Sequence, residues 1–135
     1  MKELRIAATV ENIEVVTDFV NEQLEAVDCP MKAQMQIDIA IDELFGNIAY
    51  YAYAPHVGEA TVRVEVVEAP LAVVITFIDS GVPYNPLVKA DPDTTLSAEE
   101  REIGGLGIFI TKKTMNSVTY TYENGENILT MIKKA

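Results

Sequence analysis

Residues 59–81, EATVRVEVVEAPLAVVITFIDSG, contain the pattern that decides the fold. Polar and apolar residues alternate over 59–68, which is typical of a β-strand with one buried face. Residues 71–78 are almost wholly apolar, as expected of a central strand covered on both faces. Because only the short break at Ala69-Pro70 separates the two strands, the sequence predicts a hairpin within one sheet.

The flanking sequence supplies further strands and helices. The expected elements are a strand over 2–9, helices over 11–27 and from Pro30 to about Ala54, a helix over 108–115, and a hairpin of strands 117–123 and 127–133 around Asn124-Gly125. Hairpin-paired strands with helices gathered in separate runs predict an α+β fold, a two-layer α/β sandwich with one mixed sheet under about three helices. The strict βαβ alternation of a parallel Rossmann sheet is not found in the sequence.

The long helix over 30–54 is expected to bury a broad apolar face. The residues expected on this face are Met31, Met35, Ile37, Ile41, Leu44, Ile48 and Tyr51. Gly46 lies in the middle of the helix, where glycine costs about 1 kcal/mol relative to alanine. Close packing or the approach of another backbone would justify it.

Residues 82–103 show no clean period and contain Pro83, Pro86 and Pro92. A loop of about twenty residues inside a compact domain is usually a functional lid or a disordered stretch. The sequence has no internal repeat and no domain boundary. We therefore expect a single domain over 1–135, with a flexible lid at about 84–103.

The composition narrows the classes of function. The chain of 135 residues has 21 acidic and 10 basic side chains, hence a formal charge of 10 − 21 = −11. This charge argues against a nucleic-acid partner, which needs clustered Lys and Arg, but allows a nucleotide or a basic protein partner. No apolar run approaches the ~20 residues that span a bilayer, and no signal peptide is evident. With the single Cys29, these features predict a cytoplasmic protein without a membrane partner.

Two polar positions stand out within apolar surroundings. Glu43 and Asn47 lie four positions apart on the long helix and therefore share one face. They could form a solvated strip, or carry a carboxylate and an amide toward a ligand. Asp79 directly follows the apolar strand; it could be a turn former or a hydrogen-bond acceptor at the floor of a pocket.

The stretch Gly104-Gly105-Leu106-Gly107 precedes an apolar helix. A helix N-terminus offers unpaired N–H groups and a positive dipole end to phosphates. The stretch is neither a Walker A loop nor a Rossmann fingerprint. A flexible hinge is the alternative interpretation.

The order and spacing of three motifs resemble a known superfamily. Glu43-Leu44-Phe45-Gly46-Asn47, Asp79-Ser80-Gly81 and Gly104-Gly105-Leu106-Gly107 look like the N box and the two glycine boxes of the GHKL (histidine kinase-like) ATPases, which include gyrase, heat-shock chaperones, mismatch-repair ATPases and histidine kinases. The resemblance covers nearly the whole chain. It implies a Bergerat fold, an α/β sandwich with a mobile lid between the glycine boxes.

Within this superfamily, the bare domain resembles the bacterial anti-sigma factor serine/threonine kinases. Asp42-Glu43, Ala52-Tyr53 and the stretch from Gly105 to Phe109 look like that branch. A sensor histidine kinase would need a phosphoacceptor histidine before the domain, whereas His56 follows the long helix.

The resemblance implies that the cofactors are ATP and Mg²⁺. Asn47 would hold Mg²⁺ against the phosphates, consistent with an oxygen donor for a hard cation. Glu43 would be the general base that accepts the proton of a substrate hydroxyl.

The same resemblance implies which residues would contact the adenine and the phosphates of ATP. Asp79 would accept a hydrogen bond from the adenine amino group, and Gly81 would let the purine lie close to the backbone. The backbone N–H groups directed at the phosphates would be those of Gly105, Leu106 and Gly107.

The sequence departs from the family pattern at three positions. Pro83 stands where a second glycine is usual, and Tyr51 where a histidine often follows the N box. Asn127 replaces the threonine near the adenine and can still donate and accept hydrogen bonds. Arg101 is the only arginine of the expected lid.

The resemblance also implies partners. The kinase would phosphorylate a small antagonist protein, hold a sigma factor inactive until the antagonist displaces it, and form a homodimer. The alternatives are an adaptor that binds ATP and sequesters a partner without phosphotransfer, and a degenerate domain that binds no nucleotide.

Overall fold

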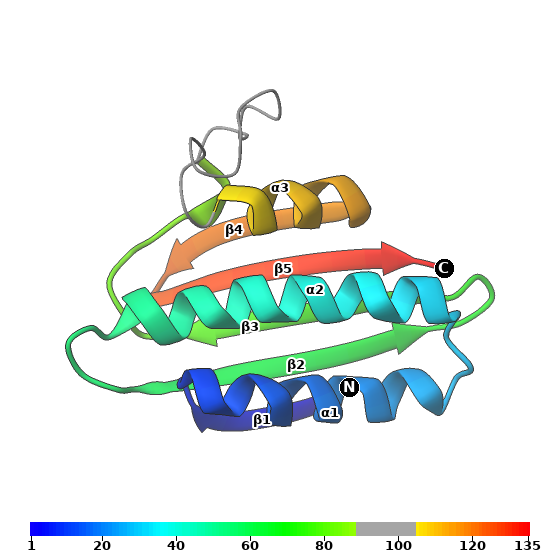
Figure 1. Ribbon diagram of the computed structural model, residues 1–135, viewed down its shortest axis with the longest axis horizontal. Coiled ribbons are helices and arrows are strands. Elements are labelled where there is room, and N and C mark those ends of the chain that lie inside the picture. The colour runs from blue at the N-terminus through cyan, green and yellow to red at the C-terminus, as the bar shows by residue number, and fades with distance from the viewer. Residues whose placement is uncertain (89–104) are drawn as a thin grey trace.

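Figure 1 shows the computed structural model, which describes residues 1–88 and 105–135. Its main elements are β1 (Lys2–Ala7), α1 (Ile13–Glu25), α2 (Met31–Asn47), β2 (Glu59–Val67), β3 (Ala72–Asp79), α3 (Gly105–Thr114), β4 (Ser117–Glu123) and β5 (Glu126–Lys134). Three short turns complete them: the 3₁₀ turns η1 (Val10–Asn12) and η3 (Pro86–Val88), and a wider π-type turn, η2 (Ile48–Ala52). Most of the predicted lid, including Arg101, lies outside the described residues.

The strands form one five-stranded sheet in the order β1-β2-β3-β5-β4. The α+β class and the two-layer sandwich are confirmed, but the prediction of a mixed sheet is wrong, because every neighbouring pair is antiparallel. The strand β4 does run in the direction of β3. However, β5 returns along the chain and lies between them, so the two parallel strands never pair.

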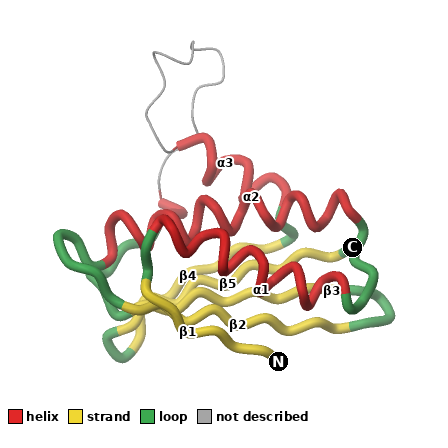
Figure 2. Tube along the Cα trace, turned by 60° about the horizontal axis from the view of Figure 1, so that its bottom comes forward, coloured by secondary structure: helices red, strands yellow, loops and turns green. Residues whose placement is uncertain are grey.

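The three helices cover one face of the sheet (Figure 2). The helix α2 runs over the middle, with α1 on one side and α3 on the other (Figure 1). The largest fully buried side chains of this interface are Phe45, Phe77, Leu24, Ile37, Ile41, Ile75 and Met131. Among residues 1–88 and 105–135, no helix has both the length and the apolar character needed to cross a bilayer.

The strand β3 is covered fully on one face only. Val73, Ile75 and Phe77 face the helices and are buried, whereas Val74 and Thr76 face the other way and are half-buried. The prediction of a strand covered on both faces is therefore wrong, since the helices form a single layer.

The buried face of α2 also differs from the expectation. Met31 and Met35 are 68% and 57% exposed, and Tyr51 is exposed as well. Ile37, Ile41 and Leu44 are buried as predicted, and Ala33 and Ala40 join them on the inward face. These positions also recur at helical spacing.

Gly46 is buried against α1 without being sterically required. A Cβ atom at this position would lie 3.8 Å from Cδ1 of Ile13, an ordinary van der Waals distance. Close packing therefore does not explain this glycine.

Candidate functional site

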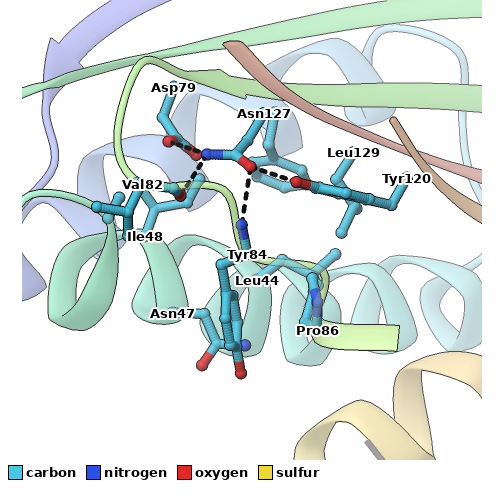
Figure 3. A pocket seen from close by; sticks show the side chains of 12 residues that line it. Leu44, Asn47, Ile48, Asp79, Val82, Tyr84, Pro86, Tyr120, Asn127 and Leu129 are labelled. Carbon is cyan, nitrogen blue, oxygen red and sulfur yellow. Dashed lines mark hydrogen bonds between the residues drawn. The ribbon is translucent and has the colours of Figure 1, made fainter. Parts of the chain in front are cut away.

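A small cavity lies where α2 gives way to η2, beside the end of β3 and the start of β5 (Figure 3). Its volume is about 40 Å³. The residues that line it are Leu44, Asn47, Ile48, Ala52, Phe77, Asp79, Val82, Tyr84, Pro86, Tyr120, Asn127 and Leu129. Three of the predicted site residues, far apart in the sequence, thus meet in one place.

Asp79 forms part of the cavity wall at the end of β3 and is only 6% exposed. Its Oδ1 atom accepts hydrogen bonds from the backbone N–H of Gly81 and from Nδ2 of Asn127, both at 2.9 Å. Burial raises the pKa of the Asp79 carboxyl, the bonds from Asn127 and Gly81 lower it in part, and the charge of Glu126 raises it further. Asp79 is thus a buried acceptor at the cavity, more than a surface turn former.

Asn127 lies directly opposite Asp79 because the two residues are partners in the pairing of β3 with β5. Its Nδ2 group donates to Asp79 and to the carbonyl of Val82, the latter also at 2.9 Å. Its Oδ1 atom accepts from the backbone N–H of Tyr84 at 3.1 Å and from the Tyr120 hydroxyl. Figure 3 shows all four contacts converging on this one amide.

Gly81 is required by the backbone of η2. A Cβ atom at Gly81 would overlap the carbonyl of Ala52, and the N–H of the next residue, Val82, donates to that same carbonyl at 2.9 Å. Tyr53 adds a second link, because its hydroxyl accepts from the N–H of Ser80 at 2.8 Å. The segment after β3 is therefore held against the end of α2.

Glu43 and Asn47 share one face of α2, as predicted. Both are half-buried, and Nδ2 of Asn47 lies 3.4 Å from Oε1 of Glu43. Since Nδ2 is directed toward a carboxylate, Oδ1 is the atom of Asn47 that suits a cation.

The start of α3 packs against Glu43. A Cβ atom at Gly107 would overlap the Glu43 carboxylate, so this glycine permits the close approach of the two helices. Gly105 is the first residue of α3, and Leu106 is 41% exposed. The second glycine box thus lies next to the N box, while Gly104 is outside the described residues.

Sequence reasoning missed Tyr84 and Tyr120. Tyr84 lies in the aperiodic stretch after Gly81, and its ring lies 5.8 Å from that of Tyr51. Tyr120 lies on β4, where the sequence pattern predicted a strand and no role in a site. Both reach the cavity through strand pairing and chain reversal, which no local pattern encodes.

Asn47 is the candidate protein ligand for a metal at this site. The described part of the chain contains no group of three or more His, Cys, Asp or Glu residues placed to hold an ion. Asn47 fits Mg²⁺ bound with a nucleotide, because Mg²⁺ keeps several waters and substrate phosphates and takes only one or two protein ligands.

The cavity is smaller than a nucleotide needs. Ligand pockets commonly measure about 300–1,000 Å³, against about 40 Å³ here. Tyr84 and Pro86, which line one side, belong to the segment that follows Gly81. Movement of the Tyr84 side chain would enlarge the cavity while its backbone N–H stays bonded to Asn127.

The comparison with known families agrees with this geometry. The family model described as the histidine kinase-like ATPase domain matches residues 6–133. The chain therefore belongs to the histidine kinase-like ATPase family, which makes it a domain of the ATP-binding type. No curated protein matches the chain. The GHKL resemblance is confirmed; the anti-sigma subtype stays a prediction.

Proposed function

We propose that the protein is a serine/threonine kinase that uses ATP and Mg²⁺ and acts as an anti-sigma regulatory factor. The observation that carries the proposal is the meeting of Glu43, Asn47 and the start of α3 beside the Asp79 cavity. At one end of the site, Asp79 is a buried hydrogen-bond acceptor for a nucleobase. At the other end lie the Glu43 carboxylate, the Asn47 amide oxygen and the N-terminus of α3.

The two ends suggest how ATP lies. Its adenine would donate an amino hydrogen to Asp79, and its phosphates would approach the N-terminus of α3. The backbone N–H groups of Gly105, Leu106 and Gly107 would face those phosphates, since the first N–H groups of a helix lack partners within it. Bound Mg²⁺, held by Asn47 Oδ1, would neutralise phosphate charge.

Glu43 is suited to the proton transfer. As the γ-phosphoryl group passes from ATP to a serine or threonine oxygen, the bond to ADP breaks, the new P–O bond forms, and the hydroxyl proton passes to the Glu43 carboxylate. The contact with Asn47 holds that carboxylate beside the metal ligand.

The partners follow from the resemblance to the anti-sigma kinases. We propose a small antagonist protein as the phosphoryl acceptor, a sigma factor as the sequestered partner, a homodimer as the working form and the cytoplasm as the location. The formal charge of −11 supports a partner with a basic surface.

A transfer assay separates the kinase from the adaptor. The parent protein and Glu43→Gln would each be incubated with γ-labelled ATP, Mg²⁺ and a native-cell extract cleared of ATP-binding proteins, and serine and threonine phosphate would be quantified. A labelled protein that depends on Glu43 supports the kinase. If both proteins bind ATP and neither labels any extract protein above background, the adaptor interpretation replaces it.

A further inference from the structure

The side-chain amide of Asn127 has no hydrogen-bonding capacity left for a ligand. A carboxamide has two N–H donors and one oxygen with two lone pairs. Both donors are engaged, by Asp79 Oδ1 and Val82 O, and the oxygen accepts from Tyr84 N and the Tyr120 hydroxyl. The side chain is also only 6% exposed.

The orientation of this amide is fixed by its backbone partners. The carbonyl of Val82 can only accept and the N–H of Tyr84 can only donate. The nitrogen must therefore face Val82 and the oxygen must face Tyr84. The nitrogen is then necessarily the atom that meets Asp79.

This arrangement decides which oxygen of Asp79 serves a ligand. Both hydrogen bonds that the described residues give to this carboxylate end on Oδ1. Oδ2 is consequently the oxygen left for a donor in the cavity. Rotation of the carboxylate would break two bonds at once.

We propose that Asn127 is a positioning residue for adenine recognition: held by Tyr120, it orients Asp79 toward the 6-amino group without a hydrogen bond of its own to the nucleotide. It also ties Asp79 to the segment from Val82 to Tyr84 that covers the cavity. This inference rests on the proposed ATP binding and replaces the direct adenine contact that the sequence suggested for Asn127. Selectivity for the 6-amino group should therefore depend on two side chains that form no hydrogen bond with the ligand.

The test compares ATP with purine riboside triphosphate, which lacks only the 6-amino group. Calorimetric titration with Mg²⁺ would give the ratio of the two affinities for the parent, Tyr120→Phe and Asn127→Ala. Tyr120→Phe is the gentler change, since it removes one hydroxyl and keeps the ring. Tyr122→Phe is the matched control: Tyr122 lies on the same strand, is 44% exposed and does not line the cavity.

We expect the parent and Tyr122→Phe to prefer ATP, and both other variants to lose about tenfold of that preference. The affinity for the analogue should hardly change. Equal losses for both ligands, or an unchanged ratio in Tyr120→Phe and Asn127→Ala, would show a merely structural role and overturn the inference. A parent that binds both ligands equally would also overturn it while leaving ATP binding intact, whereas a parent that binds neither would refute the proposed function itself.

Discussion

At the scale of single residues, the burial of Asp79 makes the stability of the fold depend on pH. Burial raises its pKa above the ordinary value of 3.8, so the folded state holds this proton more tightly than the unfolded state does. The stabilisation from protonated Asp79 is then fully present below the unfolded pKa and is lost as the pH rises through the folded pKa.

Asp79→Asn tests this directly. The variant should lose the part of the pH dependence of stability that lies between the ordinary and the raised pKa, because the amide does not titrate. It should also bind ATP about ten- to a hundredfold more weakly, since an amide mismatched to the adenine amino group costs roughly 1–3 kcal/mol. Thermal unfolding across pH and ATP titration provide the readouts, with the exposed Asp42→Asn as control. Unchanged ATP affinity would remove Asp79 from base recognition.

Gly107 is the second residue with a specific consequence. In Gly107→Ala the added methyl group would overlap the Glu43 carboxylate. Either α3 or Glu43 must move, and overpacking of this kind typically costs about 1–3 kcal/mol. We expect a lower denaturation midpoint and slower phosphotransfer, whereas the exposed neighbour Leu106→Ala should leave stability nearly unchanged. Parent-like stability and rate in Gly107→Ala would show that α3 does not need this close approach.

At the scale of elements, α2 carries Glu43 and Asn47 of the site and is destabilised by Gly46 in its middle. Gly46→Ala should stabilise the protein by about 1 kcal/mol, because alanine favours the helix and its Cβ would meet Ile13 Cδ1 at an ordinary distance. Chemical denaturation of the parent and the variant would measure the change. A destabilised variant would mean that α1 and α2 approach each other more closely than this packing shows.

The change from α2 to the π-type turn η2 comes directly after Asn47. Such turns are frequent at functional sites. Here the carbonyl of Ala52, the last residue of the turn, accepts a hydrogen bond from the N–H of Val82. The end of the helix thereby anchors the first glycine box, although the sequence predicted only a helix that continues to about Ala54.

At the scale of the whole molecule, local patterns predicted the elements and the pairing within the two hairpins, but not the order of the strands in the sheet. The alternation over 59–68 and the turn at Asn124-Gly125 were sufficient to place β2, β4 and β5. The antiparallel character of the sheet depends on the insertion of β5 between β3 and β4, which is a long-range event. Apolar spacing also fits both faces of α2, and it led to Met31 and Met35 being placed inside.

The sequence predicted most residues of the site, but it did not predict the contacts between them. The motifs around Asn47, Asp79 and Gly107 could be found because a whole family shares their spacing. The role of Asn127 in holding Asp79 could not be predicted, because this role follows from the strand register that places the two residues opposite each other. The contact of Tyr120 with Asn127 likewise depends on the pairing of β4 with β5.

The measurement that tests the central claim most directly is a calorimetric titration of the protein with ATP, with and without Mg²⁺. We predict saturable binding of one ATP per chain that Mg²⁺ strengthens, and loss of most of this Mg²⁺ effect in Asn47→Ala, because that variant lacks the proposed oxygen ligand. Leu106→Ala, whose backbone N–H is retained, serves as the control. Absence of ATP binding by the folded parent at millimolar nucleotide, with or without Mg²⁺, would contradict the account.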